Sequence, residues 1–422
     1  MNNTTTTPTI SHNNKQTQNG YKNTAIGVLP SNWEVRKLGE LCFGKGEYGI
    51  NAAAVNFSEN LPAYIRITDI DDDGYFSSNK KCSVDDINSS NFYLNKNDIV
   101  FVRTGADTGK TYLYNENDGK LVFAGFLIRF KIDTSKANDY FLRSFTQSKP
   151  YWDWVKTVCT RSGQPGINSA EYYSLQLPIP PLPEQQKIAE ILSTWDEAIT
   201  NCKNTINTLK ARNKGLAQQL FSGKKRLKGF SDKWVETTIE KITKYFSNKN
   251  KSLIDARIYS VTNSNGFVYQ SDHFSREVAG DDLTGYKIVR KNEFAYNPAR
   301  INVGSIAFFT DDIGVISSLY VCFKTNEKVT NKFLIEWLKI DKTKHDIERY
   351  GEGGVRIYLW YDLFKKLKIN LPSLEEQTAI AEVLETTDQE LKSYQAKLEA
   401  LQNQKKGLMQ QLLTGKIRVN VK

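Results

Sequence analysis

The feature that most constrains this chain is an internal repeat. Within its 422 residues, residues 180–227 align without a gap onto residues 372–419. The match is strongest near its end, where KGLAQQLFSGKKR at 214–226 faces KGLMQQLLTGKIR at 406–418. Self-similarity at a fixed period predicts repeated structural units. The chain should therefore consist of two halves, each with a variable block followed by a fixed segment.

The remaining parts of the two halves resemble each other more faintly. Residues match at the start of each half and at a few anchors inside the blocks: Trp33 with Trp234, Leu38 with Ile239, Asn97 with Asn292, Phe130-Lys131 with Phe323-Lys324, and Phe141-Leu142 with Phe333-Leu334. Between these anchors the two blocks differ. The fixed segments thus read as a common scaffold, and the blocks as its variable parts.

Both fixed segments have the apolar spacing of a coiled-coil seam, which alternates between four and three residues. In the first segment the positions are Ile188, Leu192, Trp195, Ile199, Cys202, Ile206, Leu209, Asn213, Leu216 and Leu220. In the second they are Ile380, Leu384, Thr387, Leu391, Tyr394, Leu398, Leu401, Lys405, Leu408 and Leu412. A polar residue interrupts both seams at the same place, Asn213 and Lys405. The second helix can bury its seam on the first only by running back, so the sequence predicts an antiparallel two-helix coiled coil.

Helix start and stop signals agree with this prediction. Pro183 suits the first turn of one helix, and Ser373 with Glu376 forms a possible capping box on the other. Gly223 and Gly415 can supply the left-handed residue after each helix. Each helix should then have about 38 residues and a length of roughly 57 Å.

The variable blocks combine short β-type runs with helical stretches near their ends. We expect β-structure in 98–104, 122–132, 293–297 and 304–310, and helices in 138–155 and 330–347. Each block should be a mixed α/β domain, and the fold class of the whole chain is α+β. The expected divisions are a disordered arm at 1–26, the first domain at 27–178, the first long helix at 179–228, the second domain at 229–371, and the second long helix with a tail at 372–422.

Three motifs resemble enzyme sites, but each lacks a required part. The segment GADTGKT at 105–111 has three residues between its glycines where a phosphate-binding loop needs four, and a strand-like run follows it instead of a helix. The segment GKGEYG at 44–49 follows no convincing strand, so we expect a flexible loop there. Asn297-Pro298-Ala299 lacks the second proline and the aromatic residue of the amino-methyltransferase motif.

Composition excludes further classes. Three histidines and five scattered cysteines offer no metal or nucleophile constellation, so we expect no catalytic residues, no metal and no cofactor in this chain. The longest apolar stretch, residues 121–128, is far too short for a membrane span, and the cysteine usage fits a reducing cytoplasm. The net charge of +10 is compatible with nucleic-acid binding but is also common in proteins that bind none.

The Gly-rich loops of the two blocks contain side chains that are suited to binding DNA. Arginine can bind guanine, and asparagine or glutamine adenine, through two hydrogen bonds, while lysine and arginine also hold phosphates. In the first block the candidates are Lys45, Tyr48, Arg66, Arg103, Lys110, Arg161 and Gln164. In the second they are Tyr296, Asn297, Arg300, Asn302, Arg349 and Arg356. A solvated charge or a structural hydrogen bond is the ordinary alternative for any one of them, so the set carries more weight than its members.

The repeated proline-rich turn that leads into EQQKIAEIL or EEQTAIAEVL, with the long helix and the closing KGLxQQLxxGKxR, resembles the specificity subunit of type I restriction-modification enzymes. The segments YIRITDI at 64–70, NDIVFVRTGADTGK at 97–110 and YNPARINVGSI at 296–306 are also similar to target-recognition domains of that family. The resemblance runs from about Gly27 to the end of the chain.

This resemblance implies a DNA reader without catalytic activity of its own. Each block would read one half of a gapped, asymmetric target in double-stranded DNA, and the helices would set the spacer. Two methyltransferase subunits, which carry S-adenosylmethionine, would dock on the chain. In a complete restriction enzyme, two translocase and nuclease subunits that use ATP and magnesium would join them.

Two alternatives remain open at the level of the sequence. The same sequence would suit a methyltransferase system that works without translocase subunits. It would also suit a protein of another class, a coiled-coil scaffold that joins two protein-binding domains. A DNA reader must lose affinity as salt rises, whereas such a scaffold has no salt-dependent affinity for DNA.

Overall fold

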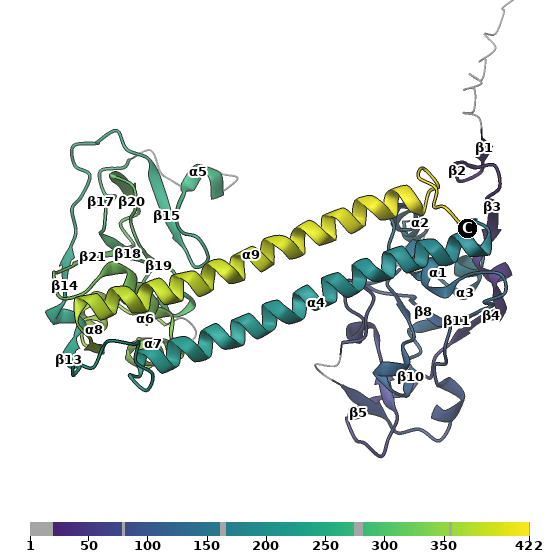
Figure 1. The fold of residues 1–422 in the computed structure, drawn as a ribbon, viewed down its shortest axis with the longest axis horizontal. Coiled ribbons are helices and arrows are strands. Elements are labelled where there is room, and N and C mark those ends of the chain that lie inside the picture. The colour runs from purple at the N-terminus through teal and green to yellow at the C-terminus, as the bar shows by residue number, and fades with distance from the viewer. Residues whose placement is uncertain (1–19, 78–80, 161–165, 274–281, 354–356, 422) are drawn as a thin grey trace, which may run out of the picture. The chain divides into compact units, whose positions relative to one another are not determined.

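The computed structural model describes residues 20–77, 81–160, 166–273, 282–353 and 357–421 (Figure 1). It divides into two compact units. The first unit consists of Met1–Cys202 and Lys397–Lys422, and the second of Lys203–Ala396. The division therefore crosses both long helices, whereas the sequence analysis placed the domain boundaries at the ends of these helices. Each unit holds one variable block, part of the first long helix and part of the second.

Two long helices, α4 (Leu182–Phe221) and α9 (Leu374–Leu412), occupy the fixed segments. All twenty predicted seam positions are buried or half-buried, so the predicted register is confirmed. Gly223 and Gly415 follow the helices with φ of 68° and 69°, the left-handed conformation that a side chain disfavours. The lengths of 40 and 39 residues are close to the expected 38.

Within each unit the two helices run in opposite directions. In the first unit, Lys405 Nζ lies 2.6 Å from Asp196 Oδ1. In the second unit, Asn213 Nδ2 donates to the carbonyl of Thr387 at 2.9 Å. A second pair in each unit, Glu184 with Arg418 and Arg226 with Glu376, shows that the residue number rises along one helix as it falls along the other, as predicted. The two polar interruptions of the seam therefore each meet a polar partner, but only Lys405 brings a charge to it.

The same three side chains fasten the end of the helix pair in both units. In the first unit Glu184, which is 3% exposed, accepts hydrogen bonds from Trp33 Nε1 at 3.1 Å and from two nitrogens of Arg418 at 2.7 Å. Arg418 follows α9, Glu184 lies in the first turn of α4, and Trp33 precedes the block. We call this arrangement the Trp-Glu-Arg clasp. It joins three separate parts of the chain at one buried carboxylate.

The clasp recurs in the second unit. Glu376 is 1% exposed and accepts from Trp234 Nε1 at 3.0 Å and from Arg226 at 2.6 and 2.7 Å. The amide of Glu376 also donates to Ser373 Oγ at 3.3 Å, so half of the predicted capping box is present. The other half is absent because the carboxylate of Glu376 is occupied by Arg226 and Trp234.

The glutamine next to each clasp ties the helix pair to the block. Gln185 Oε1 accepts from the amide of Asn138, the N-cap residue of α1 (Asp139–Thr146), at 2.8 Å. Gln377 Oε1 accepts from the amide of Thr330, the N-cap residue of α6 (Asn331–Lys339), at 2.9 Å. In both copies of the repeat, the glutamate binds the arginine and the tryptophan of the clasp. The glutamine that follows it binds the N-cap residue of a helix in the block.

The first block contains two four-stranded sheets, one of order β4-β11-β8-β9 and one of order β10-β6-β7-β5. The strands of the first sheet are β4 (Cys42–Tyr48), β8 (Asp98–Val102), β9 (Thr111–Leu113) and β11 (Leu127–Ile132). Those of the second are β5 (Ala54–Asn56), β6 (Ala63–Ile65), β7 (Cys82–Val84) and β10 (Leu121–Phe123). The helices are α1, α2 (Lys149–Cys159) and α3 (Ser169–Tyr173), and β3 (Glu34–Lys37) pairs with β12 (Gln176–Ile179) beside them.

The second block repeats the first of these sheets in the same order, β14-β21-β18-β19. Its strands are β14 (Thr243–Phe246), β18 (Phe294–Tyr296), β19 (Ile306–Phe308) and β21 (Val321–Thr325). The other sheet has the order β16-β15-β20-β17, with β15 (Ile258–Thr262), β16 (Gly266–Tyr269), β17 (Lys287–Arg290) and β20 (Ile313–Ile316). Here β13 (Val235–Thr238) pairs with β22 (Lys368–Leu371), and the helices are α5 (Gln270–His273), α6, α7 (Asp341–Tyr350) and α8 (Tyr361–Phe364).

The faint sequence anchors mark equivalent positions in the two blocks. Asn97 and Asn292 precede β8 and β18 with φ of 69° and 68°, a conformation that asparagine tolerates better than most residues. Phe130 lies opposite Ile99 in the first sheet, and Phe323 opposite Phe294 in the second. The predicted mixed α+β class is therefore confirmed, with one sheet common to both blocks.

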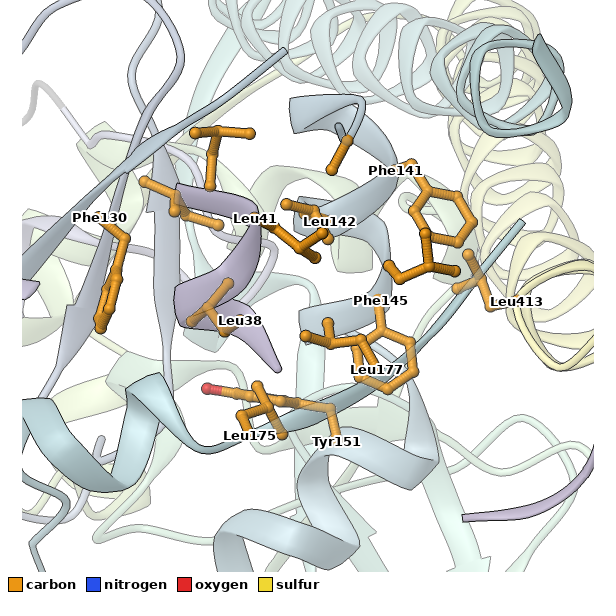
Figure 2. Packing of buried hydrophobic residues seen from close by; sticks show 14 of the residues in the cluster. Leu38, Leu41, Phe130, Phe141, Leu142, Phe145, Tyr151, Leu175, Leu177 and Leu413 are labelled. Atoms are coloured by element: carbon orange, nitrogen blue, oxygen red, sulfur yellow. The ribbon is translucent and has the colours of Figure 1, made fainter. Parts of the chain in front are cut away.

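The core of the first unit joins the block to the helix pair. Leu38, Phe141, Phe145 and Leu177 from the block pack in one buried cluster with Leu413, which follows α9 (Figure 2). In the second unit the corresponding cluster joins Phe333 and Trp337 of α6 to Ile380 and Leu384 of α9. Burial of large apolar side chains is the main stabilising term in such a core. Each block is thus held on the helices by a continuous apolar core as well as by the clasp.

Two expectations from the sequence were wrong. Residues 21–24, placed in the disordered arm, form β1 (Tyr21–Thr24), which pairs with β2 (Gly27–Pro30), while residues 1–19 lie outside the described residues. The hairpin is anchored because Tyr21 Oη donates to the carbonyl of Gly415 at 3.0 Å. The segment GKGEYG, expected as a loop, lies largely in β4, where a Cβ on Gly46 would come within 2.6 Å of Phe130.

The clasp leads to a prediction on stability. The substitution Glu184→Gln removes the buried charge that satisfies Arg418 and Trp33, and it should lower the free energy of unfolding by about 2–4 kcal/mol. Thermal or urea denaturation of the full chain measures this change. Glu190→Gln is the control, because Glu190 lies on the same helix with 66% of its side chain exposed, paired to Lys187. Equal stability of the two variants would contradict a structural role for the clasp.

The Asp196–Lys405 pair leads to a prediction on pH dependence. Burial opposes the ionised form, but the charge of Lys405 and hydrogen bonds from Lys405 and Tyr140 hold the pKa of Asp196 below its ordinary value. The ionised carboxylate therefore adds stability above the unfolded pKa of about 4, and this contribution is lost as pH falls through the lower folded pKa. Asp196→Asn should cost on the order of 3 kcal/mol at pH 7 and progressively less below pH about 4. A difference between parent and variant that does not change with pH would contradict the prediction.

Candidate nucleic-acid interface

In the first unit a turn of residues 103–110 joins β8 to β9, and we call it the first turn. The amide of Val102 donates to the carbonyl of Lys110 at 2.8 Å, which closes the turn on the end of β8. The amide of Ile167, ahead of α3, donates to the carbonyl of Arg103 at 2.9 Å. The turn is therefore held from two sides by backbone hydrogen bonds, and its side chains start from fixed positions.

The glycines of the first turn serve its conformation. Gly105 and Gly109 have φ of 86° and 99°, and a Cβ on Gly109 would lie 2.8 Å from Val155 of α2. Strand β9 follows directly, so the helix N-terminus that a phosphate-binding loop requires is not at this position. The sequence prediction of a tight turn rather than a nucleotide site agrees with this geometry.

Arg103 and Tyr48 form a stacked pair beside the first turn. The guanidinium carbon of Arg103 lies 4.9 Å from the centre of the Tyr48 ring. Tyr48 Oη in turn accepts a hydrogen bond from the amide of Ser169 at 3.2 Å. Tyr48 is 42% exposed, and Arg103 is half-buried. A guanidinium that lies over an aromatic ring can still donate hydrogen bonds to a base edge or a phosphate, so this pair suits nucleic-acid recognition.

Lys110 at the end of the first turn is engaged within the protein. Its Nζ lies 2.7 Å from Asp72 Oδ1 and 2.8 Å from Asp107 Oδ1, and 19% of its side chain is exposed. Burial opposes the charge, but the hydrogen bonds to Asp107 and Asp72 raise the pKa of Lys110 above its ordinary value. Lys110 is therefore charged at neutral pH, and a phosphate must compete with Asp72 to reach it.

The second unit has a corresponding turn of residues 297–305 between β18 and β19, which we call the second turn. The amide of Asn297 donates to the carbonyl of Ser305 at 3.0 Å, closing this turn. The amide of Leu359, ahead of α8, donates to the carbonyl of Pro298 at 3.0 Å. This bond has the same place as the bond from Ile167 to the first turn. Each unit thus has one such turn on its copy of the repeated sheet, and the segment ahead of a short helix anchors it.

Side chains of the second turn differ from those of the first. Arg300 is exposed, Asn302 is half-buried, and Val303 is 56% exposed. Asn297 Oδ1 accepts from the amide of Ala299 at 3.0 Å, so this side chain shapes the turn. The two units therefore offer different chemical groups on a common backbone frame.

Sequence reasoning missed an aromatic pair beside the second turn. Tyr358 and Trp360 are 38% and 47% exposed and stack with ring centres 6.4 Å apart and planes 15° from parallel. Leu359 between them is fully buried and carries the hydrogen bond to the second turn. The signal was available in the alternation of Tyr358, Leu359 and Trp360, because a period of two exposes every second side chain of an extended segment.

Apart from Tyr296, the predicted DNA-contacting residues fall into three groups: those away from the turns, those outside the described residues, and those at the turns. Lys45 on β4 is exposed, Arg66 pairs with Asp69 through two hydrogen bonds of 2.9 Å, and Arg349 on α7 lies 3.4 Å from Asp346 with 65% of its side chain exposed. Arg161, Gln164 and Arg356 lie outside the described residues. The turn residues Arg103, Lys110, Asn297, Arg300 and Asn302, with Tyr48, are brought to the two turns.

Tyr296 requires a correction. Its side chain is fully buried in the second core, with ring centres 6.3 Å from Phe323 and 5.3 Å from Phe364. Burial raises the pKa of Tyr296, and no hydrogen-bond partner of its hydroxyl is found in the described parts of the chain. The residue ends β18 and faces inward, so the expectation that it contacts DNA does not hold in this conformation.

The described residues also bear on metal binding and on membrane insertion. No group of three or more His, Cys, Asp or Glu side chains is placed to hold a metal ion there. Within the same residues, none of the helices combines the length and apolar character that crossing a membrane demands.

Comparison with known proteins identifies the class of this repeated architecture. A model of the type I restriction modification DNA specificity domain matches the chain twice, over residues 30–211 and 221–403. The two matches cover most of the chain and one falls on each half of the repeat. The chain belongs to the family of type I restriction-modification specificity subunits, as the sequence motifs predicted. Such subunits are the DNA-recognition components of these systems and are generally non-catalytic.

Relatives share the architecture over their full length. The chain is 27% identical to the putative type I restriction enzyme MjaX specificity subunit of Methanocaldococcus jannaschii, with 95% of this chain and 97% of the relative covered. It is 26% identical to the MjaVIII specificity subunit of the same organism, with 93% and 94% covered. The solved S subunit of the type I restriction-modification system from M. genitalium is similar in fold, with a TM-score of 0.56 and 17% identity over 90% of this chain and 96% of that chain.

The two turns lead to a prediction on DNA affinity. Arg103→Ala and Arg300→Ala should each weaken binding of a duplex carrying the target by about tenfold, because each removes an arginine available to a base or phosphate. Fluorescence anisotropy of the full chain over a salt series measures this change. Arg36→Ala is the control, since Arg36 lies on β3 and pairs with Glu34 and Glu40. If both turn variants bound the duplex as tightly as the parent, the prediction that the turns contact DNA would be wrong.

Proposed function

We propose that each block reads one half of a gapped, asymmetric DNA target through its turn. The observation that carries this proposal is the equivalence of the two turns. Each joins equivalent strands of the sheet that has the same order in both blocks, and each is anchored by a backbone hydrogen bond from the segment ahead of a short helix. Their side chains differ, with Arg103 and Lys110 on one and Arg300 and Asn302 on the other. A common frame with different side chains is suited to reading two different half-sites.

The chemistry of the turns favours DNA over a protein partner. Arg103 lies over the ring of Tyr48, and planar guanidinium groups match both phosphate oxygens and the acceptor edge of guanine. The second turn combines the exposed Arg300 with the aromatic pair Tyr358 and Trp360, which can pack on sugars and base edges. Cationic and aromatic groups together on a rigid turn are typical of nucleic-acid contacts.

The long helices would set the distance between the half-sites. A helix of 40 residues has a length of roughly 60 Å, and its two ends lie in different units. The clasps and the apolar cores fasten each block to the part of the helix pair in its own unit. The spacer of the target should therefore be constant.

The repeated scaffold would also dock the partners. Two copies of one surface offer two equivalent positions, so we propose that two methyltransferase subunits bind this chain, and that two translocase and nuclease subunits join them in a complete restriction enzyme. S-adenosylmethionine, ATP and magnesium would then be held by the partner subunits. Transfer of the methyl group to adenine would be the work of the methyltransferase, and this chain would choose the site.

Methylome sequencing tests the proposed function directly. Cells that express this chain with its methyltransferase partner should carry one gapped motif modified at adenine on both strands, and cells without this chain should lose it. Arg103→Ala and Arg300→Ala should each reduce modification or relax the motif in one half, and in different halves. A methylome that is the same with and without the chain would contradict the proposal and favour a scaffold that joins proteins.

A further inference from the structure

A buried cluster of charges lies between the first block and the helix pair. Asp196 of α4 and Lys405 of α9 are 2.6 Å apart, and Arg143 of α1 places Nη1 3.5 Å from Asp196 Oδ2. The side chains of Asp196, Lys405 and Arg143 are 10%, 12% and 3% exposed. Tyr140 Oη also donates to Asp196. Buried charges are costly to desolvate, so such a cluster is a weak source of stability and is better suited to fixing one specific arrangement.

The cluster extends from the helices to a loop of the first block, residues 71–75, which we call the acidic loop. Arg143 Nη2 donates to the carbonyl of Asp73 at 3.0 Å, and Gln147 Nε2 donates to the same oxygen at 2.6 Å. The guanidinium of Arg143 also lies 4.4 Å from the ring centre of Tyr75. Lys405 Nζ is 3.5 Å from Gln147 Oε1. Arg143 and Gln147 thus meet at one carbonyl of the acidic loop, and each also contacts one member of the Asp196–Lys405 pair.

The acidic loop in turn contacts the first turn. Asp72 Oδ1 lies 2.7 Å from Lys110 Nζ, although 95% of the Asp72 side chain is exposed. Gly74 approaches closely enough to the strand after the turn that a Cβ there would be 2.7 Å from the carbonyl of Thr111. A continuous set of polar contacts therefore runs from Lys405 and Asp196 through Arg143 and the acidic loop to the first turn.

The second unit has a different arrangement at the equivalent position. Asn213 stands where the first unit has Lys405, and it donates to the carbonyl of Thr387 and accepts from Arg212, both residues of the two helices. Asp388, equivalent to Asp196, has 43% of its side chain exposed and lies 3.5 Å from Lys339. Ser305 precedes β19 as Lys110 precedes β9, and its hydroxyl donates to the carbonyl of Val261. A neutral amide therefore occupies the seam position at which the first unit has the buried lysine.

We propose that Lys405, Asp196 and Arg143 are positioning residues for DNA recognition by the first block. They hold the acidic loop against the first turn, so that Asp72 fixes Lys110 and the first half-site is read by a turn coupled to the helix pair. The second turn is independent of the equivalent layer of the seam. This inference rests on the proposed function, because it concerns how one of the two half-sites is read.

The test compares Lys405→Met with Asn213→Met, which changes the equivalent seam position in the second unit. The full chain is titrated with the duplex target found by methylome sequencing, with a duplex scrambled in one half, and with a duplex scrambled in the other. Arg103→Ala and Arg300→Ala identify which half belongs to which block. Lys405→Met should reduce discrimination of the first half by roughly tenfold and leave the second half unchanged. Asn213→Met should change neither.

Two further variants separate positioning from a loss of folding. Lys405→Arg keeps the charge and should retain discrimination of the first half, and thermal denaturation of every variant shows whether the chain is folded. In an Asp72→Asn background, Lys405→Met should cause no additional loss of discrimination, because the contact through which it acts is already gone. Should Lys405→Met unfold the chain, Arg143→Lys and Gln147→Leu replace it in the same titrations.

The outcomes distinguish this inference from the proposed function. If the parent does not discriminate against either scrambled half, the proposed function fails and the inference falls with it. If the parent does discriminate, but Lys405→Met affects both halves equally or neither, the charge cluster acts only on the register of the helices and the inference is overturned. Additive losses in the Asp72→Asn background would overturn it as well.

Discussion

A buried carboxylate at each end of the helix pair is the interaction on which the rest of the structure depends. Glu184 and Glu376 are almost fully buried, and each is neutralised by an arginine that follows the other long helix and by an indole that precedes a block. An isolated carboxylate in this environment would be strongly destabilising. The three partners must therefore be present together, which makes the closing of the helices and the seating of the blocks one event.

From this constraint follows a separation of tasks along the chain. The clasp, the following glutamine and the heptad seam are repeated, and they define a frame with equivalent positions in both units. The turns carried by the equivalent sheets can present different side chains, because their backbone is anchored by hydrogen bonds from Ile167 and Leu359. Under the proposed function, such a frame would allow the recognised DNA sequence to change while the surface proposed to dock the methyltransferase subunits is maintained.

The sequence predicted the parts that depend on periodicity and local chemistry. The register of both helices, their direction, the terminal glycines and the paired anchors such as Asn97 and Asn292 follow from spacing and from backbone preference. The site was less predictable. Tyr296 has the same residue type as the exposed Tyr48, but all three residues of β18 are buried, because this strand lies between β19 and β21 and has an apolar cluster on each face. Asp69 and Asp107 lie only three residues from Arg66 and Lys110, so local reasoning could have paired them. Asp72, the other partner of Lys110, comes from a distant loop and was beyond such reasoning.

The two units differ at the polar seam position, and this difference shows how the helix pair contacts the first block. Pairing of the two helices would require only the same polar contact at the equivalent seam position of both units. Instead, one unit has Asp196 with Lys405, and the other has Asn213 with a backbone carbonyl. The charged layer requires additional partners because two buried ions cannot satisfy all their hydrogen bonds between themselves. Tyr140 and Gln147 supply them from the first block, and Arg143 adds a charge 3.5 Å from Asp196. Arg143 and Gln147 also hold the acidic loop. The chemical requirement of the buried pair is therefore what connects the scaffold to one recognition turn.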